Sequence, residues 1–380
     1  MKLIVQKDIL LSALKTADQF TDATASLSIL HCVKIEARDG AIRIVGSDIT
    51  SGVRVAIGGE ILEPGAICIE AGPIAKALKT APAGIVRLET EGYNLHIRFL
   101  RADIGLEGLG ENEYVAFHEI SDSNFAFCLR AASVAEALRA TLLAATEFSR
   151  PALQCVRLSV EGTIATFVAT DGRRLHRVET EVLRAITSDK PEPAPAVSIR
   201  IPFARTLAKL LAKPCGDTIS FCIDTFGVCA SIGPIDLYCK AHADTAAYPD
   251  YKGILPDAEQ MAAPPLVLRT QETLDALDRF QALKLDPVSI RWGSAGLELR
   301  ASREDKKSAR TIKLAQTIDV ARAANGPDLD ETVWTTSLLA DAIRSASTPD
   351  VFVRRAGSML AVTGALSRDR SLAILMPQRV

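Results

Sequence analysis

The stretch Leu30-His31-Cys32-Val33-Lys34-Ile35 recurs without a gap as Leu153-Gln154-Cys155-Val156-Arg157-Leu158. The same offset of 123 residues pairs Asp48 with Asp171 and Arg54 with Arg177. A fainter third copy runs from Val288–Trp292 through Gly296 to Leu297–Ala301, and it keeps the order strand, turn, strand. Three copies of about 125 residues therefore fill the chain of 380, and a repeat at a fixed period is the first guide to architecture.

Each copy has the same pattern of predicted elements. A first helix with apolar residues at intervals of three and four begins each copy, as at Leu10, Ala13 and Leu14. Short strands with glycine turns follow, then a second helix over 73–80, 202–213 or 337–347, and then another strand over 85–88, 218–223 or 351–354. The pattern predicts an α+β fold with helices on one face of antiparallel sheet. We expect three domains, over residues 1–120, 124–258 and 264–380.

Composition excludes several classes of protein. With 48% hydrophobic and 24% charged residues the chain is neither disordered, nor fibrous, nor a disulfide mini-protein. Its apolar runs fall short of a membrane span, and its first residues do not resemble a signal peptide. The eight cysteines mostly lie in strand-like apolar runs, where free thiols behave as small hydrophobic groups. These features predict a cytoplasmic protein with reduced cysteines.

Basic residues concentrate on the second helices, although the chain carries a net charge of −2. A solvated helix face is the simpler interpretation of any one of them. The same bias in all three copies also fits a shared anionic partner, contacted through its phosphates without regard to sequence. The candidate residues that face this partner are Lys76, Lys79, Arg205, Lys209, Lys213 and Arg344, against one acidic residue, Asp341.

The chain lacks the residue patterns of common enzymes. We find no phosphate-binding loop, no dinucleotide-binding glycine motif, no His-Glu-x-x-His and no Cys-x-x-Cys. The five histidines are scattered and predict packing or surface roles. We therefore expect no catalytic residues, no metal and no cofactor.

Three motifs resemble the bacterial DNA polymerase III beta subunit, or beta sliding clamp, family. Phe167–Leu175 is similar to the family's central-domain signature, and Tyr248–Pro256 to its Phe-Pro-Asp-Tyr segment before the third domain. The chain ends in Met376-Pro377-Gln378-Arg379-Val380, which is similar to the family's Met-Pro-x-Arg-Leu tail. The motifs occur in the family's order along the whole chain, so we identify a divergent member of this family.

The resemblance implies the DNA clamp fold and a ring of two chains joined head to tail around duplex DNA. Such a clamp is a non-catalytic accessory subunit of a DNA-directed DNA polymerase in DNA replication. The implied partners are duplex DNA without sequence preference, the catalytic subunit of DNA polymerase III, the clamp loader, other proteins with a clamp-binding motif, and a second copy of the chain. Encirclement explains how a slightly acidic protein holds DNA with weak phosphate contacts.

The resemblance also implies a groove for partner peptides between the second and third domains. Aliphatic and methionine side chains would make the slot, and polar groups its rim. The residues carried over are Leu153, Thr170, Gly172, Arg173, Arg174, Leu175, Pro249, Ile254, Leu285, Thr335, Met359, Ile374, Leu375, Met376, Pro377, Gln378, Arg379 and Val380. Arg173, Gly253, Leu285, Thr335 and Gln378 depart from the residues usual in the family.

The family closes its ring by pairing an edge strand of the first domain with one of the third domain of the other chain. The first-domain candidate, Ala102–Leu109, is acidic, and the third-domain candidate, Lys306–Leu314, is basic. Opposite charges select partners more than they add affinity, so they favour this pairing over that of identical strands. The interface candidates are Asp103, Ile104, Leu106, Glu107, Lys306, Lys307, Arg310, Ile312 and Lys313.

Two alternatives to a housekeeping clamp remain at this stage. A divergent clamp paralogue that serves specialised polymerases or mobile DNA would carry the same motifs. An enzyme or ligand-binding protein on an unrelated α+β repeat would share only the repeat, and it would not require a dimer.

Overall fold

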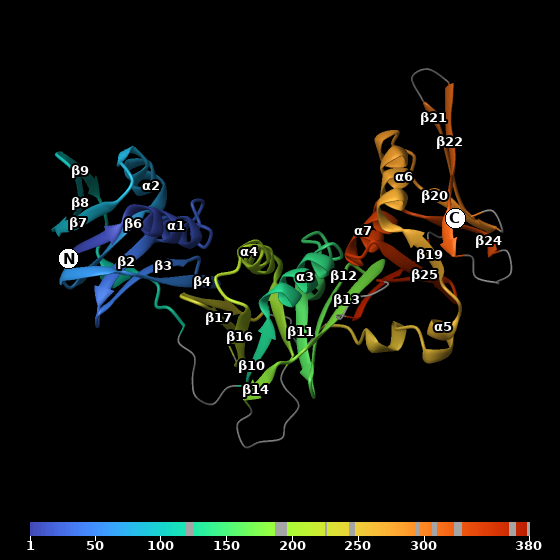
Figure 1. Cartoon of the computed structure of the whole chain (residues 1–380), viewed down its shortest axis with the longest axis horizontal. Coiled ribbons are helices and arrows are strands. Elements are labelled where there is room, and N and C mark those ends of the chain that lie inside the picture. The colour runs from blue at the N-terminus through green and yellow to red at the C-terminus, as the bar shows by residue number, and fades with distance from the viewer. Residues whose placement is uncertain are drawn as a thin grey trace. The chain divides into compact units, whose positions relative to one another are not determined.

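The computed structural model describes residues 1–118, 125–186, 196–224, 226–242, 248–293, 296–305, 310–322, 329–364 and 370–377 (Figure 1). The chain divides into two compact units, which are described separately. Unit 1 consists of Met1–Cys128, Arg184–Pro191 and Lys213–Ala241. Unit 2 consists of Leu129–Leu183, Glu192–Ala212 and His242–Val380.

The same order of elements occurs three times within the described residues. Each repeat has one strand, a helix, five strands, a second helix and three strands. The short helix α5 (Ala258–Ala262) lies between the second and third repeats. The α+β repeat predicted from Leu30–Ile35 and its copies is therefore confirmed, while the three domain boundaries remain predictions.

The bounds of the elements follow this order. The first repeat contains β1 (Lys2–Gln6), α1 (Lys7–Asp18), β2 (Cys32–Arg38), β3 (Ala41–Ser47), β4 (Ser51–Ile57), β5 (Gly59–Glu63), β6 (Gly65–Glu70), α2 (Ala71–Thr80), β7 (Ile85–Glu91), β8 (Asn94–Phe99) and β9 (Ala102–Glu107). The second contains β10 (Phe125–Arg130), α3 (Ala131–Leu142), β11 (Cys155–Glu161), β12 (Ile164–Thr170), β13 (Arg174–Glu181), β14 (Arg184–Ile186), β15 (Val197–Arg200), α4 (Ile201–Leu211), β16 (Thr218–Ile223), β17 (Gly227–Ile232) and β18 (Ile235–Lys240). The third contains β19 (Leu266–Arg269), α6 (Thr270–Ala282), β20 (Val288–Gly293), β21 (Gly296–Asp305), β22 (Arg310–Ile318), β23 (Val320–Arg322), β24 (Leu329–Trp334), α7 (Thr336–Ser345), β25 (Asp350–Ala356), β26 (Met359–Gly364) and β27 (Arg370–Leu375).

Of the six long helices in the described residues, five begin directly after a strand, and α7 begins one residue later. Their apolar residues decide which face is buried. In α1 the buried side chains include Leu10 and Leu14, and in α2 they include Ile74 and Leu78, four residues apart in each case. This spacing lines one face of a helix. The observed second helices begin one or two residues before their predicted starts, and α4 and α7 end two residues before their predicted ends. In α2 and α4 the start differs because the proline at 73 or 202 lies within the first turn rather than at its start.

Within the described ranges the strands form four antiparallel sheets. Unit 1 contains a sheet of order β5-β1-β7-β8-β9 and one of order β14-β10-β16-β17-β18-β4-β3-β2-β6. Unit 2 contains a sheet of order β15-β11-β12-β13-β27-β26-β25-β19-β23 and one of order β22-β21-β20-β24. The two nine-stranded sheets each combine strands from two successive repeats, through the pairs β18–β4 and β13–β27.

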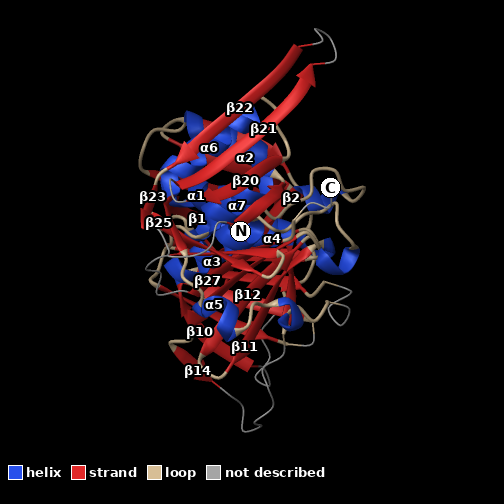
Figure 2. Ribbon diagram, turned by 90° about the vertical axis from the view of Figure 1, so that its right-hand side faces the viewer, coloured by secondary structure: helices blue, strands red, loops and turns tan. Residues whose placement is uncertain are grey.

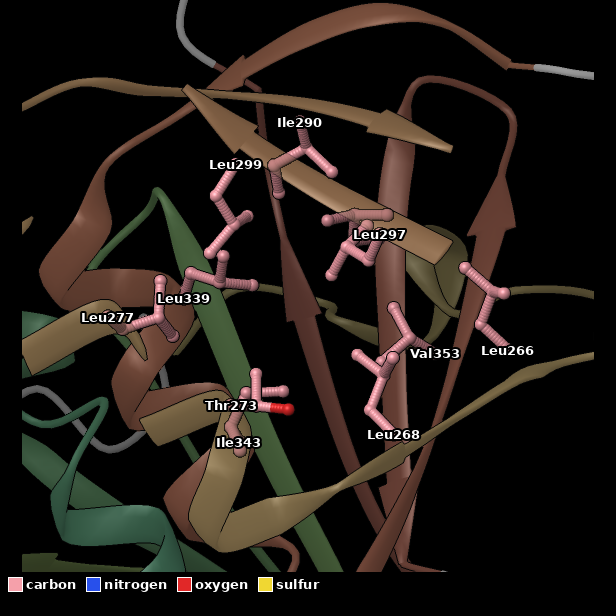
Figure 3. Close-up of a pocket in the computed structure, with 11 residues that line it drawn as sticks. Leu266, Leu268, Thr273, Leu277, Ile290, Leu297, Leu299, Leu339, Ile343 and Val353 are labelled. Carbon is pink, nitrogen blue, oxygen red and sulfur yellow. The ribbon is translucent and has the colours of Figure 1, made fainter. Parts of the chain in front are cut away.

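The core of the third repeat lies between its helices and its strands. Leu277 of α6 and Leu339 of α7 point towards Ile290, Leu299 and Val353 on the strands (Figure 3). Among the residues that line the cavity in Figure 3 only Thr273 is polar, and its hydroxyl donates a hydrogen bond to the Arg269 carbonyl oxygen at 2.8 Å. The hairpin β21–β22 extends beyond the strands beside it (Figure 2).

Candidate functional site

The candidate site in unit 2 is centred on the pair β13–β27, where the second and third repeats share a sheet. Leu175 of β13 lies directly opposite Ile374 of β27. Because directly opposed residues of antiparallel strands point to the same face, these two side chains meet although they are far apart in the chain. The central signature and the strand before the C-terminal tail thus lie side by side.

The turn before β13 is built by Thr170, Asp171 and Gly172. The Thr170 hydroxyl donates to the Arg174 carbonyl oxygen at 2.6 Å and accepts from the Gly172 amide at 3.1 Å. Asp171 Oδ1 accepts from the backbone amides of Arg173 and Arg174, at 2.9 and 3.1 Å. Gly172 has φ +87°, which an L-residue adopts only at a cost. The Thr-Asp-Gly sequence therefore fixes this turn through its own side chains.

The two arginines of the signature have different surroundings. Arg174 is largely buried and donates to Asp171 Oδ2 at 3.0 Å and to Asp341 Oδ2 of α7 at 2.5 Å. It therefore links β13 to α7 of the third repeat. Arg173 is exposed, and its carbonyl oxygen accepts a hydrogen bond from the Met376 amide at 2.9 Å. Of the two guanidinium groups, only that of Arg173 is exposed to a ligand.

An apolar cluster covers the outer face of this joint. Its buried members are Val168, Leu175 and Ile374. Four half-buried residues pack against them, namely Tyr251, Leu255, Met359 and Leu372. This set, called here the outer apolar cluster, includes Leu175, Met359 and Ile374 of the predicted groove. Half-buried aliphatic, aromatic and methionine side chains at a strand joint fit the adaptable surface that a short peptide requires.

The other predicted groove residues lie in several places. Leu153 is buried at the end of a short 3-10 helix, Pro249 and Ile254 are exposed, and Met376, Pro377 and Thr335 are half-buried. Leu285 and Leu375 belong to the core of the third repeat, not to the outer apolar cluster. Gln378, Arg379 and Val380 lie outside the described residues.

Sequence reasoning missed Val168, Tyr251, Leu255 and Leu372. Alternation along the strands provides a signal for two of them, because Val168 shares the face of Thr170 and Leu372 that of Ile374. The same alternation places Leu375 on the opposite face. Tyr251 and Leu255 lie in the connection after the second repeat, which is not a strand, so alternation could not predict their positions.

The basic candidates on the second helices differ in their ion pairs. Lys76, Lys79, Lys209 and Lys213 are exposed. Arg205 forms an ion pair with Glu147, and Arg344 forms ion pairs with Asp278 at 2.9 Å and Asp341 at 3.3 Å. The arginine charges are therefore partly neutralised within the chain, and the lysines carry most of the free positive charge.

The interface candidates lie on β9 and β22, each at the edge of its sheet. Ile104, Leu106 and Ile312 are half-buried, whereas Glu107 and Lys313 are exposed. Asp103 accepts from Arg98 Nε at 2.9 Å and contacts His96 Nδ1 at 3.0 Å. These contacts, that of Arg98 first, hold the pKa of the Asp103 carboxyl below its usual value. Arg310 begins β22, and Lys306 and Lys307 lie outside the described residues.

Comparisons with known proteins agree with these features. The family model for the DNA polymerase III beta subunit, N-terminal domain, matches residues 1–118. The beta sliding clamp of Bacillus subtilis is 25% identical over 295 residues, 74% of each chain. That of Micrococcus luteus is 25% identical over 217 residues, 57% of this chain and 67% of its own length.

The solved structures extend the likeness to the whole chain. The sliding clamp of B. subtilis has a TM-score of 0.86 at 21% identity and covers 100% of this chain and 99% of its own. The beta subunit of Pseudomonas aeruginosa has a TM-score of 0.84 at 20% identity with full coverage of both chains. The chain is a divergent member of the beta sliding clamp family.

Membership of the clamp family bears on the chemistry of the chain. The clamp is a non-catalytic processivity subunit, so activity depends on binding surfaces rather than on reacting groups. Among the described residues no group of three His, Cys, Asp or Glu side chains is placed to hold a metal ion. No helix of this clamp's described part is long and apolar enough to cross a membrane.

Proposed function

We propose that this chain is a DNA sliding clamp that encircles duplex DNA and tethers the replicative polymerase, with three domains near residues 1–120, 124–258 and 264–380. This proposal rests on the threefold repetition of one order of elements. One strand of each of the first two repeats pairs with a strand of the repeat that follows it. The cytoplasm is the proposed site of action, and the polymerase III catalytic subunit and the clamp loader are the proposed partners.

The ring closes through a second copy of the chain. The last strand of one repeat pairs with the fourth strand of the repeat before it, in β18–β4 and again in β13–β27. The strands that remain without this pairing are β9, the last of the first repeat, and β22, the fourth strand of the third. When two copies join head to tail, β9 of each copy pairs with β22 of the other. Long exposed edge strands favour this pairing, because their backbone groups otherwise have no strand to bond with.

The repeats also give the register of this joint. The hairpin β8–β9 is aligned with β17–β18 at their two-residue turns, and β3–β4 with β21–β22 at the pairs Ile42–Ile57 and Leu297–Ile318. This alignment, with the pairing of β18 and β4, places Ile104 opposite the partner's Leu314 and Leu106 opposite the partner's Ile312. Gly105 then faces the partner's Lys313 on the other side of the sheet, with Asp103 and Glu107 diagonal to it. An apolar row and a charged row therefore run along opposite faces of the joint.

Topological retention on DNA tests the function. The loaded dimer should remain on closed circular DNA and slide off once the circle is linearised, because only encirclement depends on the ends of the duplex. The measurement is co-elution of the protein with circular and linear DNA in gel filtration. Equal retention on both forms would show binding without a ring.

The basic second helices provide the phosphate contacts of the proposed clamp. Replacing Arg205, Lys209 and Lys213 with alanine should weaken DNA binding and reduce the slope of log affinity against log salt by up to about 0.9 for each lost contact. Fluorescence anisotropy with one duplex at several salt concentrations measures this slope. An unchanged slope, or a strong preference for one duplex sequence, would contradict phosphate contacts by these helices.

The outer apolar cluster is the proposed docking surface for partner peptides. Deleting residues 376–380 should abolish binding of a polymerase-derived clamp-binding peptide, because it removes Met376, whose amide donates to the Arg173 carbonyl oxygen beside Leu175. Leu175→Ala should weaken binding by about 1–2 kcal/mol through lost apolar contact. Calorimetry measures both, and Ile164→Ala on the exposed start of β12 is a matched control. Full peptide affinity after the deletion would exclude this surface.

A further inference from the structure

The helix α6 carries a row of exposed acidic residues. Glu272, Asp275 and Asp278 follow one another at intervals of three and lie on one side of the helix. Gln271 Nε2 donates to Asp275 at 2.7 Å, and Arg344 of α7 pairs with Asp278 at 2.9 Å. Arg279 is also exposed on this face and lines one open pocket together with Glu272 and Asp275. Two arginines therefore face three carboxylates, and the row keeps one net negative charge.

The helix α2 carries the opposite charge. Its sequence Ala-Gly-Pro-Ile-Ala-Lys-Ala-Leu-Lys-Thr contains no acidic residue, and both Lys76 and Lys79 are exposed. The two ammonium groups are three residues apart and so lie on one face. At the C-terminal end of this helix Lys7 Nζ donates to the Ala81 carbonyl oxygen at 3.1 Å, which adds a third positive charge.

Unit 2 shows how a strand joint brings two helices together. Next to the pair β13–β27, α3 of the second repeat contacts α7 of the third repeat. Arg139 Nη1 of α3 donates to the Arg344 carbonyl oxygen of α7 at 3.3 Å. Each of these residues is the ninth of its helix. The first helix of one repeat and the second helix of the next thus meet at their ninth positions.

The same rule applied to the closing joint brings α6 to α2 of the other chain. The ninth residues are then Asp278 and the partner's Lys79, and the sixth are Asp275 and the partner's Lys76. We propose that the acidic row of α6 binds the lysines of the partner's α2 and so selects the head-to-tail closure of the ring. This inference rests on the proposed function, since it requires the β9–β22 joint.

Charge makes this contact selective. An α6–α6 or α2–α2 contact would bring like charges together, which disfavours the two identical pairings. Arg344 already neutralises part of the Asp278 charge, and Arg279 lies beside Glu272 and Asp275. The row therefore offers one net negative charge to the lysines. Lys76 and Lys79 therefore serve closure as well as any contact with DNA.

The test measures the dimer without DNA. The variant K76E/K79E should raise the dissociation constant of the dimer by on the order of 100-fold at low salt, because like charges then face one another at both joints. D275K/D278K should have a similar effect alone, and all four substitutions together should restore most of the affinity. Sedimentation equilibrium gives the constants, and urea unfolding checks that each variant keeps its fold.

Lys209→Glu is the matched control, because Lys209 is the ninth residue of α4 and does not lie at the closing joint. It should leave the dissociation constant unchanged. If the parent is a dimer and K76E/K79E dimerises equally well, the helix contact is wrong while the proposed ring stands. A monomeric parent would overturn both.

Discussion

Replacing Gly105 with proline should convert the dimer into monomers while leaving each chain folded. A two-residue turn joins β8 to β9, so the backbone groups of residues 102, 104 and 106 form hydrogen bonds with β8. The backbone groups of residues 103, 105 and 107 therefore face the open edge of the sheet. Proline lacks the amide that Gly105 would donate to the partner's Lys313. The substitution thus removes a bond between chains and none within the hairpin.

The equivalent strand β18 supports this assignment of the outward groups. The Lys240 amide donates to the Thr50 carbonyl oxygen at 2.8 Å, and the Pro234 carbonyl oxygen accepts from the Ala56 amide at 2.8 Å. When the two hairpin turns are aligned, Lys240 corresponds to Glu107 of β9, and Pro234 corresponds to Arg101 in the turn before it. Every second residue from Pro234 to Lys240 therefore directs its backbone polar groups to the neighbouring strand. The residue equivalent to Gly105 is one of these.

The expected loss of affinity is large because the ring contains this joint twice. One interstrand hydrogen bond at about 1 kcal/mol, with added strain from the proline ring, raises the dissociation constant about 100-fold when both joints are counted. Gly105→Ala is the matched control, since a Cβ there would have only His96 Cε1 nearby, at 3.8 Å. Sedimentation equilibrium distinguishes the two variants. A Gly105→Pro protein as tightly dimeric as the parent would exclude β9 from the interface.

Much of the fold was predictable because local pattern and repetition agree. The helices begin within a few residues of their predicted positions, and Thr218–Ile223 is a strand with the predicted bounds. The pairs β18–β4 and β13–β27 were not predictable from pattern alone, because period-two alternation does not say which strand is the neighbour. The two pairs are recognised as equivalent joints only after both are seen in the structure, because they involve the same strands of successive repeats.

The candidate site was predictable at its turn and less so around it. The Thr170-Asp171-Gly172 turn depends on local hydrogen bonds, so its sequence is sufficient to indicate it. The positions of Leu285 and Leu375 depend on which face of a distant element is buried, and the motif alone misplaced them towards the groove. Arg174 likewise bonds to Asp341, 167 residues later in the chain, a partner that no local pattern names.

His176 lies buried at the centre of β13, between Ala169 of β12 and Ala373 of β27. Its Nδ1 lies 2.8 Å from the Ala140 carbonyl oxygen of α3, so the neutral ring donates there. Its Nε2 has no hydrogen-bond partner among the described residues. Burial lowers the pKa of His176 from 6.5 to about 4, and the Arg174 charge acts in the same direction. Protonation would place an unpaired charge inside unit 2, against helix α3.

The chain should therefore lose stability in mild acid. Because the folded pKa is below the unfolded one, the stabilising effect is complete above pH 6.5 and disappears as pH falls towards 4. The free energy of unfolding should fall by about 2 kcal/mol at pH 5 and about 3 kcal/mol at pH 4 from this group. Urea unfolding at pH 7, 6 and 5 measures it. His176→Gln keeps an amide donor for Ala140 but cannot take up the proton, so its stability should change less with pH even where it is lower at pH 7. Parallel pH profiles for the two proteins would mean that His176 is not the group that titrates.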